Sequence, residues 1–412
     1  MNTPAKGFAD PYSLDIEYLD PADPALFETQ SHWDYFKRLR EEDPVHFVAG
    51  GEFGPYWSVT KFDDIVFVDT HHDLFSSEPA IGIGESTTSF EPPMFIAMDP
   101  PRHDDQRKAV VSAVMPQRLA EMEAVIRQRV IKVLDSLPVG EEFNWVDKVS
   151  IELTTQMLAT LFDFPFEDRD KLTYWSDVAT SGPQIGGNRS EEEREAILMD
   201  ECLPYFTRLW NERASDPPGK DLLSLMIHSP ATRDMKPLEF LGNLILLIVG
   251  GNDTTRNSMS GGVLALHKNP AEFAKLKENP ALIPGMVSEV IRWQTPLAHM
   301  RRKATQDVEL GGKTIRKGER VVMWYISGNR DPEAISNPDD FIIDRDNPRF
   351  HVSFGSGIHR CMGNRLAEMQ LRVLWEEILP RFERIEVSGE PERVQSNFVM
   401  GYKDLPVILH PR

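Results

Sequence analysis

Phe354-Gly-Ser-Gly-Ile-His-Arg-Cys-Met-Gly363 sets one cysteine among glycines, directly before a run of residues typical of a helix. Residues 364–371 are good helix formers with apolar side chains at helical spacing. Free backbone N–H groups and the positive end of a helix dipole stabilise a thiolate at such a position. The glycines let a flat object approach the backbone without a side-chain clash. The pattern therefore predicts a haem with Cys361 as its axial thiolate ligand.

The spacing of this loop resembles the haem-binding loop of the cytochrome P450 superfamily, Phe-x-x-Gly-x-His-x-Cys-x-Gly. The simpler alternative is a buried structural cysteine in a glycine turn. The resemblance implies a mainly α fold, a triangular helical prism with small β-sheets, that binds haem b (iron protoporphyrin IX) and O2. It assigns the metal to Cys361 and haem contacts to the other loop positions, namely Phe354, Gly355, His359 and Gly363.

The resemblance covers nearly the whole chain and implies a single domain, 1–412. Its expected parts are an N-terminal arm and β-rich part (1–75), a substrate loop (76–98), a helical core (99–300), and a hairpin, haem-binding loop and C-terminal β part (301–412). Strands are expected at Val45–Val48 and Tyr56–Val59, and a hairpin that joins Val308–Leu310 to Val321–Tyr325 across Gly311-Gly312.

Charge and composition restrict the partners and the compartment. The 412 residues hold 45 Lys and Arg against 65 Asp and Glu, a net charge of −20, which argues against nucleic acid as a general partner. Two cysteines, one of them used for a metal, leave no structural disulfide and fit a reducing compartment. The N-terminus lacks an apolar signal region, and the longest apolar run, Leu244 to Val249, is too short to cross a bilayer. We expect a cytoplasmic protein without a membrane anchor.

The longest helical pattern runs from Pro237 to Asn269 and is apolar on nearly all sides, so it should pass through the core. Two glycines and a buried Asp253 within it are each costly, which indicates a functional place rather than only a satisfied polar kink. The family resemblance implies that Gly250 leaves room above the iron. It also implies that Thr254 hydrogen-bonds the bound oxygen and that Asp253 relays protons.

His103 and Arg107 are four residues apart in a helix that Asp99 can cap, so they share a face and suit two haem propionates. An ordinary surface pair is the alternative. By analogy with the family, Arg302 rather than Arg301 reaches a propionate. Glu289-Val-Ile-Arg292 can pair on one helix face, and the resemblance makes it a structural ion pair that also involves Arg345.

Residues 76–96 are rich in Gly, Ser and Pro, which predicts a loop, and the resemblance makes this loop a wall of the substrate pocket. Loop 181–188 reads only as flexible, and family analogy places a mobile lid there. The pocket residues expected on this basis are all apolar and predict an apolar ligand: Ile81, Ile83, Leu246, Val249, Leu297, Phe398 and Val399.

Three stretches, 250–262, 52–61 and 95–103, resemble the bacterial alkane terminal-hydroxylase family of cytochromes P450. This implies hydroxylation at the end of medium-chain alkanes or fatty acids. Between residues 345 and 372 five arginines face two acids, a net charge of +3, which suits docking of an acidic ferredoxin served by an NAD(P)H-dependent reductase. Some of these arginines could instead serve the haem or the fold.

Three other functions remain open at this point. A hydroxylase of terpenoid or other cyclic substrates would share every catalytic motif. A peroxide-driven haem-thiolate enzyme would not need the Asp253–Thr254 pair. A haem sensor that is not an enzyme would bind haem without turnover.

Overall fold

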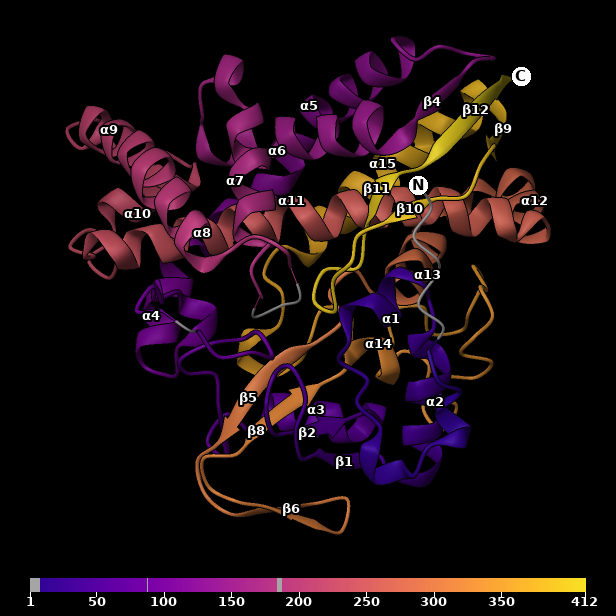
Figure 1. Cartoon of the computed structure of the whole chain (residues 1–412). Coiled ribbons are helices and arrows are strands. Elements are labelled where there is room, and N and C mark those ends of the chain that lie inside the picture. The colour runs from indigo at the N-terminus through magenta and orange to yellow at the C-terminus, as the bar shows by residue number, and fades with distance from the viewer. Residues whose placement is uncertain (1–7, 87, 184–186) are drawn as a thin grey trace.

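The computed structural model describes residues 8–86, 88–183 and 187–412. The chain is mainly helical, and helix α11 (Pro237–Lys268) crosses the middle of the molecule (Figure 1). The outline is broad where the helices gather and narrows toward a small hairpin at the opposite end. Within the described residues, no helix combines the length and the apolar character needed to cross a membrane.

The other α-helices are short to medium in length. Their bounds are α1 (Pro24–Glu28), α2 (His32–Glu42), α3 (Phe62–Thr70), α4 (Arg102–Val110), α5 (Pro116–Asp135), α6 (Glu152–Phe162), α7 (Asp170–Ala179), α8 (Glu191–Ile197), α9 (Leu203–Arg213), α10 (Leu222–His228), α12 (Pro270–Glu278), α13 (Ile283–Gln294), α14 (Tyr325–Gly328) and α15 (Asn364–Arg381).

The strands form small sheets. Their bounds are β1 (Val45–Val48), β2 (Tyr56–Val59), β3 (Phe75–Ser76), β4 (Glu142–Asn144), β5 (Met300–Ala304), β6 (Val308–Leu310), β7 (Lys313–Ile315), β8 (Arg320–Met323), β9 (Phe382–Val387), β10 (Glu392–Arg393), β11 (Tyr402–Asp404) and β12 (Pro406–Pro411). The five-stranded sheet has the order β1-β2-β8-β5-β3, and β4-β12-β9 form a second sheet.

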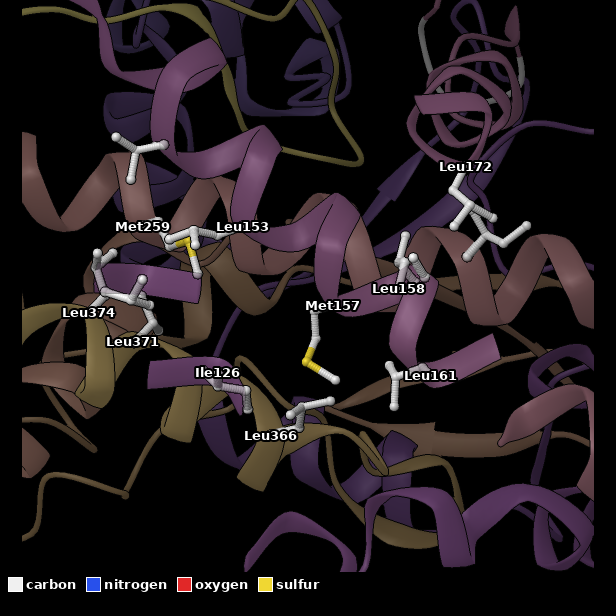
Figure 2. Close-up of a cluster of buried hydrophobic side chains, with 14 of the residues drawn as sticks. Ile126, Leu153, Met157, Leu158, Leu161, Leu172, Met259, Leu366, Leu371 and Leu374 are labelled. Carbon is white, nitrogen blue, oxygen red and sulfur yellow. The ribbon is translucent and has the colours of Figure 1, made fainter. Parts of the chain in front are cut away.

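Helix α11 forms where the sequence predicts it, with Pro237 in its first turn, where the missing N–H costs nothing. Most of its side chains are buried, and it packs against α6, α7 and α13. Figure 2 shows the neighbouring core, in which Met157 and Leu161 of α6 face Ile126 of α5 and Leu366 of α15. A fully buried side chain of this kind contributes about 1.5–3 kcal/mol through the hydrophobic effect. The long helix is therefore held by packing on several sides.

The strands at Val45–Val48 and Tyr56–Val59 are confirmed, and they pair antiparallel. The hairpin prediction was wrong in its second strand, because β6 pairs with β7 and not with residues 321–325. Gly311 and Gly312 both have positive φ, +57° and +73°, so they turn the chain back within two residues. Strand β8 instead joins the large sheet between β2 and β5.

Two other details differ from the sequence predictions or fall outside the description. Asp99 does not cap α4 with its carboxylate, which accepts hydrogen bonds from Ser76 Oγ and from the Ser77 N–H. The helix starts at Arg102, and Pro101 occupies the N-cap position. In the predicted lid loop 181–188, residues 184–186 lie outside the described residues.

The predicted ion pair of α13 is confirmed and is fully buried. Glu289 accepts from Arg292 Nε at 2.7 Å and from Arg345 Nε at 3.0 Å, both on Oε2. The Arg292 guanidinium also donates to three backbone carbonyls of the following segment, those of Asn329, Pro338 and Asp340. The group therefore ties α13 to the segment that leads to the cysteine loop.

We expect Arg292→Ala to lower the free energy of unfolding by about 3–5 kcal/mol, because it removes the closest partner of a buried carboxylate. Arg208→Ala is the matched control, since Arg208 and Glu212 form an exposed i,i+4 pair at 3.5 Å whose loss should cost less than about 1 kcal/mol. Thermal unfolding followed by circular dichroism compares the two. Equal shifts in Tm would contradict the structural role of Arg292.

Candidate functional site

Cys361 lies between a short 3₁₀ turn, Gly357–His359, and the start of α15. Its N–H donates to Phe354 O at 2.8 Å, which closes the loop on itself. Gly357 has a φ of +62°, and a Cβ there would lie 2.5 Å from Asp69 O. Only glycine fits this close approach of two backbones, so the glycine pattern of the sequence has a direct steric cause.

Cys361 is accessible at the surface of the protein, although many protein atoms lie around its sulfur. Burial raises the pKa of its thiol, while backbone N–H groups of Gly363 and Asn364 and the charge of Arg107 lower it. A Cβ on Gly363 would lie 4.0 Å from Sγ, at ordinary van der Waals contact, so this glycine borders the sulfur. This environment supplies hydrogen bonds and positive charge to a thiolate.

Gly250 is exposed in the middle of helix α11, most of whose other residues are buried. A Cβ at Gly250 would meet no atom within 4 Å, whereas one at Gly251 would lie 2.7 Å from Leu158 Cδ2. Thr254, one turn later, is half-buried, and within the described residues its hydroxyl makes only a long contact of 3.5 Å, to Gly250 O. The open space and a weakly held hydroxyl are thus on the same helix face.

Asp253 is completely buried and faces helix α7 rather than Thr254. Its Oδ1 lies 3.0 Å from Arg256 Nη2, and the same guanidinium group is 2.7 Å from Asp177 of α7. Burial raises the pKa of Asp253, and the Arg256 charge lowers it. The sequence analysis missed Arg256, although its i,i+3 spacing from Asp253 could have revealed it.

The three side chains expected at haem propionates, those of His103, Arg107 and Arg302, come together in the fold with His359 of the haem-binding loop. The rings of His103 and His359 meet at 4.3 Å between centroids. Burial, with the nearby charges of Arg302, His103 and Arg107, lowers the pKa of His359 to about 2. Among the described residues, His103 Nε2 and His359 Nδ1 are buried without a hydrogen-bond partner. Unpaired ring nitrogens of this kind, next to two arginines, suit the two carboxylates of a haem.

Asp69 connects this cluster to the cysteine loop and was not foreseen. Its Oδ1 accepts from Arg302 Nη2 at 2.8 Å, and its Oδ2 accepts from the Ser356 N–H at 2.6 Å and from Tyr325 Oη at 3.2 Å. Asp69 is 2% exposed. No local sequence pattern predicts the role of Asp69, because its partners lie more than 230 positions away in the sequence.

Arg301 and Arg302 are neighbours on strand β5 and so point to opposite faces of the sheet. Arg302 reaches Asp69, whose backbone O borders Gly357 of the haem-binding loop. Arg301 instead donates to Gly84 O at 3.0 Å on the other side. The alternation of the strand favours Arg302 as the propionate ligand, which stays a prediction.

Four of the apolar residues expected at the substrate pocket belong to one cluster, and Leu297 and Val399 in it form a β-bridge. The other two members are Ile81 and Phe398. Leu246 and Val249 are half-buried residues of α11, in the two turns before Gly250. Ile83 is fully buried and packs in a separate cluster with Ala298. The substrate role of all these residues stays a prediction.

The residues present fit a haem: an accessible sulfur, an open helix face at Gly250, and buried ring nitrogens that have no hydrogen-bond partner within the described part of the chain. The fold and this site define a haem-thiolate protein.

The comparisons with known proteins agree. The family model described as Cytochrome P450 matches residues 198–408. Linalool 8-monooxygenase from Pseudomonas putida is 35% identical and covers 96% of this chain and 100% of its own. Methyl-branched lipid omega-hydroxylase from Mycobacterium bovis is 32% identical over 90% of both chains. The solved structure of Cytochrome P450-153 from Novosphingobium aromaticivorans has a TM-score of 0.90 and 48% identity, over 95% of this chain and 99% of that one. The chain belongs to the cytochrome P450 family, which confirms the predicted fold, the haem b cofactor and O2.

We expect Gly250→Ala and Gly251→Ala to separate the function of this helix turn from its packing. Gly250→Ala should stabilise the helix by about 0.5–1 kcal/mol, because its Cβ enters open space. It should also weaken imidazole binding, since the methyl group occupies that space. Gly251→Ala presses on the fully buried Leu158 and should cost about 1–3 kcal/mol. Tm measurements and imidazole difference spectra test both, and a destabilised Gly250→Ala would show that the space is filled.

Proposed function

We propose that this cytochrome P450 monooxygenase hydroxylates the terminal methyl group of medium-chain alkanes or fatty acids. The supporting observation is the apolar cluster that contains Ile81, Leu297, Phe398 and Val399, in which Leu297 and Val399 form a β-bridge. In this proposal the cluster forms an apolar wall of the pocket and holds a flexible chain by shape, which is what selection of a chain end requires. The relative named as a lipid omega-hydroxylase supports the same chemistry.

Terpenoid hydroxylation is the second candidate, favoured by the similarity to linalool 8-monooxygenase. Terpenoids are apolar as well, so the same wall would accept them. The two candidates differ in the shape of the ligand and not in the catalytic residues.

Each part of the site has a separate task. Haem with a thiolate ligand, when bound, activates O2 and inserts one oxygen atom into a C–H bond. Cys361 supplies the thiolate, and His103, Arg107, Arg302 and His359 orient the cofactor through its carboxylates. Thr254 donates a hydrogen bond into the open space. Asp253 holds or passes a proton at Oδ2, the oxygen without a hydrogen-bond partner among the described residues.

Electrons are proposed to come from an acidic ferredoxin and its NAD(P)H-dependent reductase. Of the five arginines between 345 and 372, three are engaged in ion pairs: Arg345 with Glu289, Arg349 with Glu368, and Arg372 with Glu123 and Glu376. Arg360 and Arg365 are exposed and flank the cysteine, and no ion pair engages them within the described part of the chain. These two arginines are therefore the proposed docking charges. The proposed compartment is the cytoplasm.

Product analysis distinguishes the candidate functions. With a ferredoxin system and NADH, octane should give mainly octan-1-ol, and a C12 fatty acid mainly the 12-hydroxy product. Each tenfold preference for the terminal carbon corresponds to about 1.4 kcal/mol in activation free energy. Turnover of a monoterpene alone, without either linear product, would favour the terpenoid function.

The docking charges can be tested by reversal. Arg360→Glu and Arg365→Glu should each slow reduction by ferredoxin about tenfold at low ionic strength and less at high salt, because exposed charges are screened. The haem spectrum should stay unchanged. Arg316→Glu, on an exposed residue just after β7, is the control for a change in net charge. Reduction rates equal to that of the control would contradict the proposed docking surface.

A further inference from the structure

Loop 76–98 runs along one side of the site, from the haem-binding loop to α11. At its start Ser77 Oγ lies 2.9 Å from His359 Nε2. At its end the Phe95 N–H donates to Asn243 Oδ1 of α11 at 3.0 Å. The loop therefore spans from one wall of the site to the other.

The middle of this loop meets the segment that contains α8. Ser86 Oγ donates to Glu191 Oε2 at 3.2 Å, and α8 in turn packs against α7. We call residues 76–86, 88–98 and 187–203 the rim. In the proposed function, a substrate reaches the haem past these two segments.

The rim is strongly acidic. Its two segments hold nine carboxylates and two arginines, a net charge of −7, and residues 87 and 184–186 carry no ionisable side chain. Glu78, Glu85 and Glu91 are exposed on the loop. The remaining acids are Glu191, Glu192, Glu193, Glu195, Asp200 and Glu201.

Both rim arginines are engaged by protein groups. Arg189 Nη1 lies 3.0 Å from Glu193 Oε1. Arg194 donates from Nε to Val178 O at 3.1 Å and from Nη2 to Ala179 O at 2.7 Å. Neither guanidinium group is therefore free to bind a ligand carboxylate.

Arg301 is the cation that reaches the rim from strand β5, and a rim carboxylate neutralises it. Its side chain is 1% exposed, and Nη1 lies 3.2 Å from Glu85 Oε1. Arg320 also lies near this carboxylate, with Nε at 3.7 Å from Oε1. A ligand carboxylate would have to displace Glu85 to reach either guanidinium.

We infer that the substrate is an uncharged chain rather than a fatty-acid anion. This inference rests on the proposed function, because a chain with its terminal methyl at the haem leaves its other end toward the rim. A carboxylate at that end would lose hydration, find no free cation among the described rim residues, and face the net negative field of the rim. An alkane, an alcohol or an ester loses nothing to this field. The rim thus selects the neutral member of the proposed substrate class.

The test compares ligands that have ten-carbon chains and differ in charge. The holoenzyme is titrated with decan-1-ol, methyl decanoate and sodium decanoate at pH 7.5 and low ionic strength, and the spin-state shift gives each Kd. Decanoate should bind at least tenfold more weakly than methyl decanoate, about 1.4 kcal/mol. High salt should narrow the gap without changing the Kd of decan-1-ol. Decanoate binding equal to or tighter than the ester would overturn the inference.

The same titration separates this inference from the proposed function. A shift with a neutral monoterpenoid, and none with any ten-carbon ligand, would refute chain-end hydroxylation and still support an uncharged substrate. Tight decanoate binding would refute the neutral substrate and leave chain-end hydroxylation in place.

Two variants locate the cause at the rim. Glu91→Lys adds a cation at an exposed position and should improve decanoate affinity at least fivefold, with the Kd of methyl decanoate unchanged. Glu85→Gln should act in the same direction by releasing Arg301. Glu141→Gln, an exposed acid between α5 and β4, is the matched control and should change neither Kd. Decanoate affinities unchanged in both rim variants would overturn the inference.

Discussion

The position of the cysteine loop depends on the buried carboxylate of Glu289. It binds Arg292 and Arg345 and also accepts from the Ile342 N–H at 2.8 Å, so a charge without access to water is satisfied on both oxygens. Arg292 in turn holds the backbone at Asn329, because its guanidinium donates to Asn329 O at 2.8 Å. A buried ion pair gives little net stability, but losing one partner is costly. This group therefore restricts the arrangement of the segments it joins.

Asn329 and Asp69 form hydrogen bonds with the residues at the start of the cysteine loop. Asn329 Oδ1 accepts from the Val352 N–H at 2.9 Å, and Asn329 Nδ2 donates to Ser353 Oγ at 2.8 Å, directly before the loop begins. Asp69 holds the Ser356 N–H from the other side. Two buried polar networks thus fix the backbone that presents Cys361. The cluster proposed to line the substrate pocket is apolar instead, so polar groups position the cysteine loop, whereas the proposed selection of ligand shape would rest on packing.

Short-range patterns in the sequence predicted much of this arrangement, because their information is local. The cysteine loop, helix α11 and the Glu289–Arg292 pair each depend on residues a few positions apart. The predicted partner strand of β6 was wrong, because Gly311 and Gly312 form a tighter turn than the hydrophobic pattern alone indicates. Asp69 could not be predicted, since its contacts with Arg302 and Ser356 arise only when distant segments pack. The propionate and substrate roles stay predictions, because no contact within the protein tests them.

Asp253 and Thr254 show why adjacent residues in a motif need not act as one unit. Successive side chains on a helix differ by about 100° in direction, so Thr254 lies on the face of Gly250 while Asp253 lies toward α7. The contact of Asp253 with Arg256, and of Arg256 with Asp177, ties the carboxylate to that second helix. In the proposed function, a proton that passes from Asp253 to Thr254 therefore has to cross from one face of α11 to another. Either a water chain bridges the two faces or the Arg256 contact opens, and in the second case proton delivery is coupled to the position of α7.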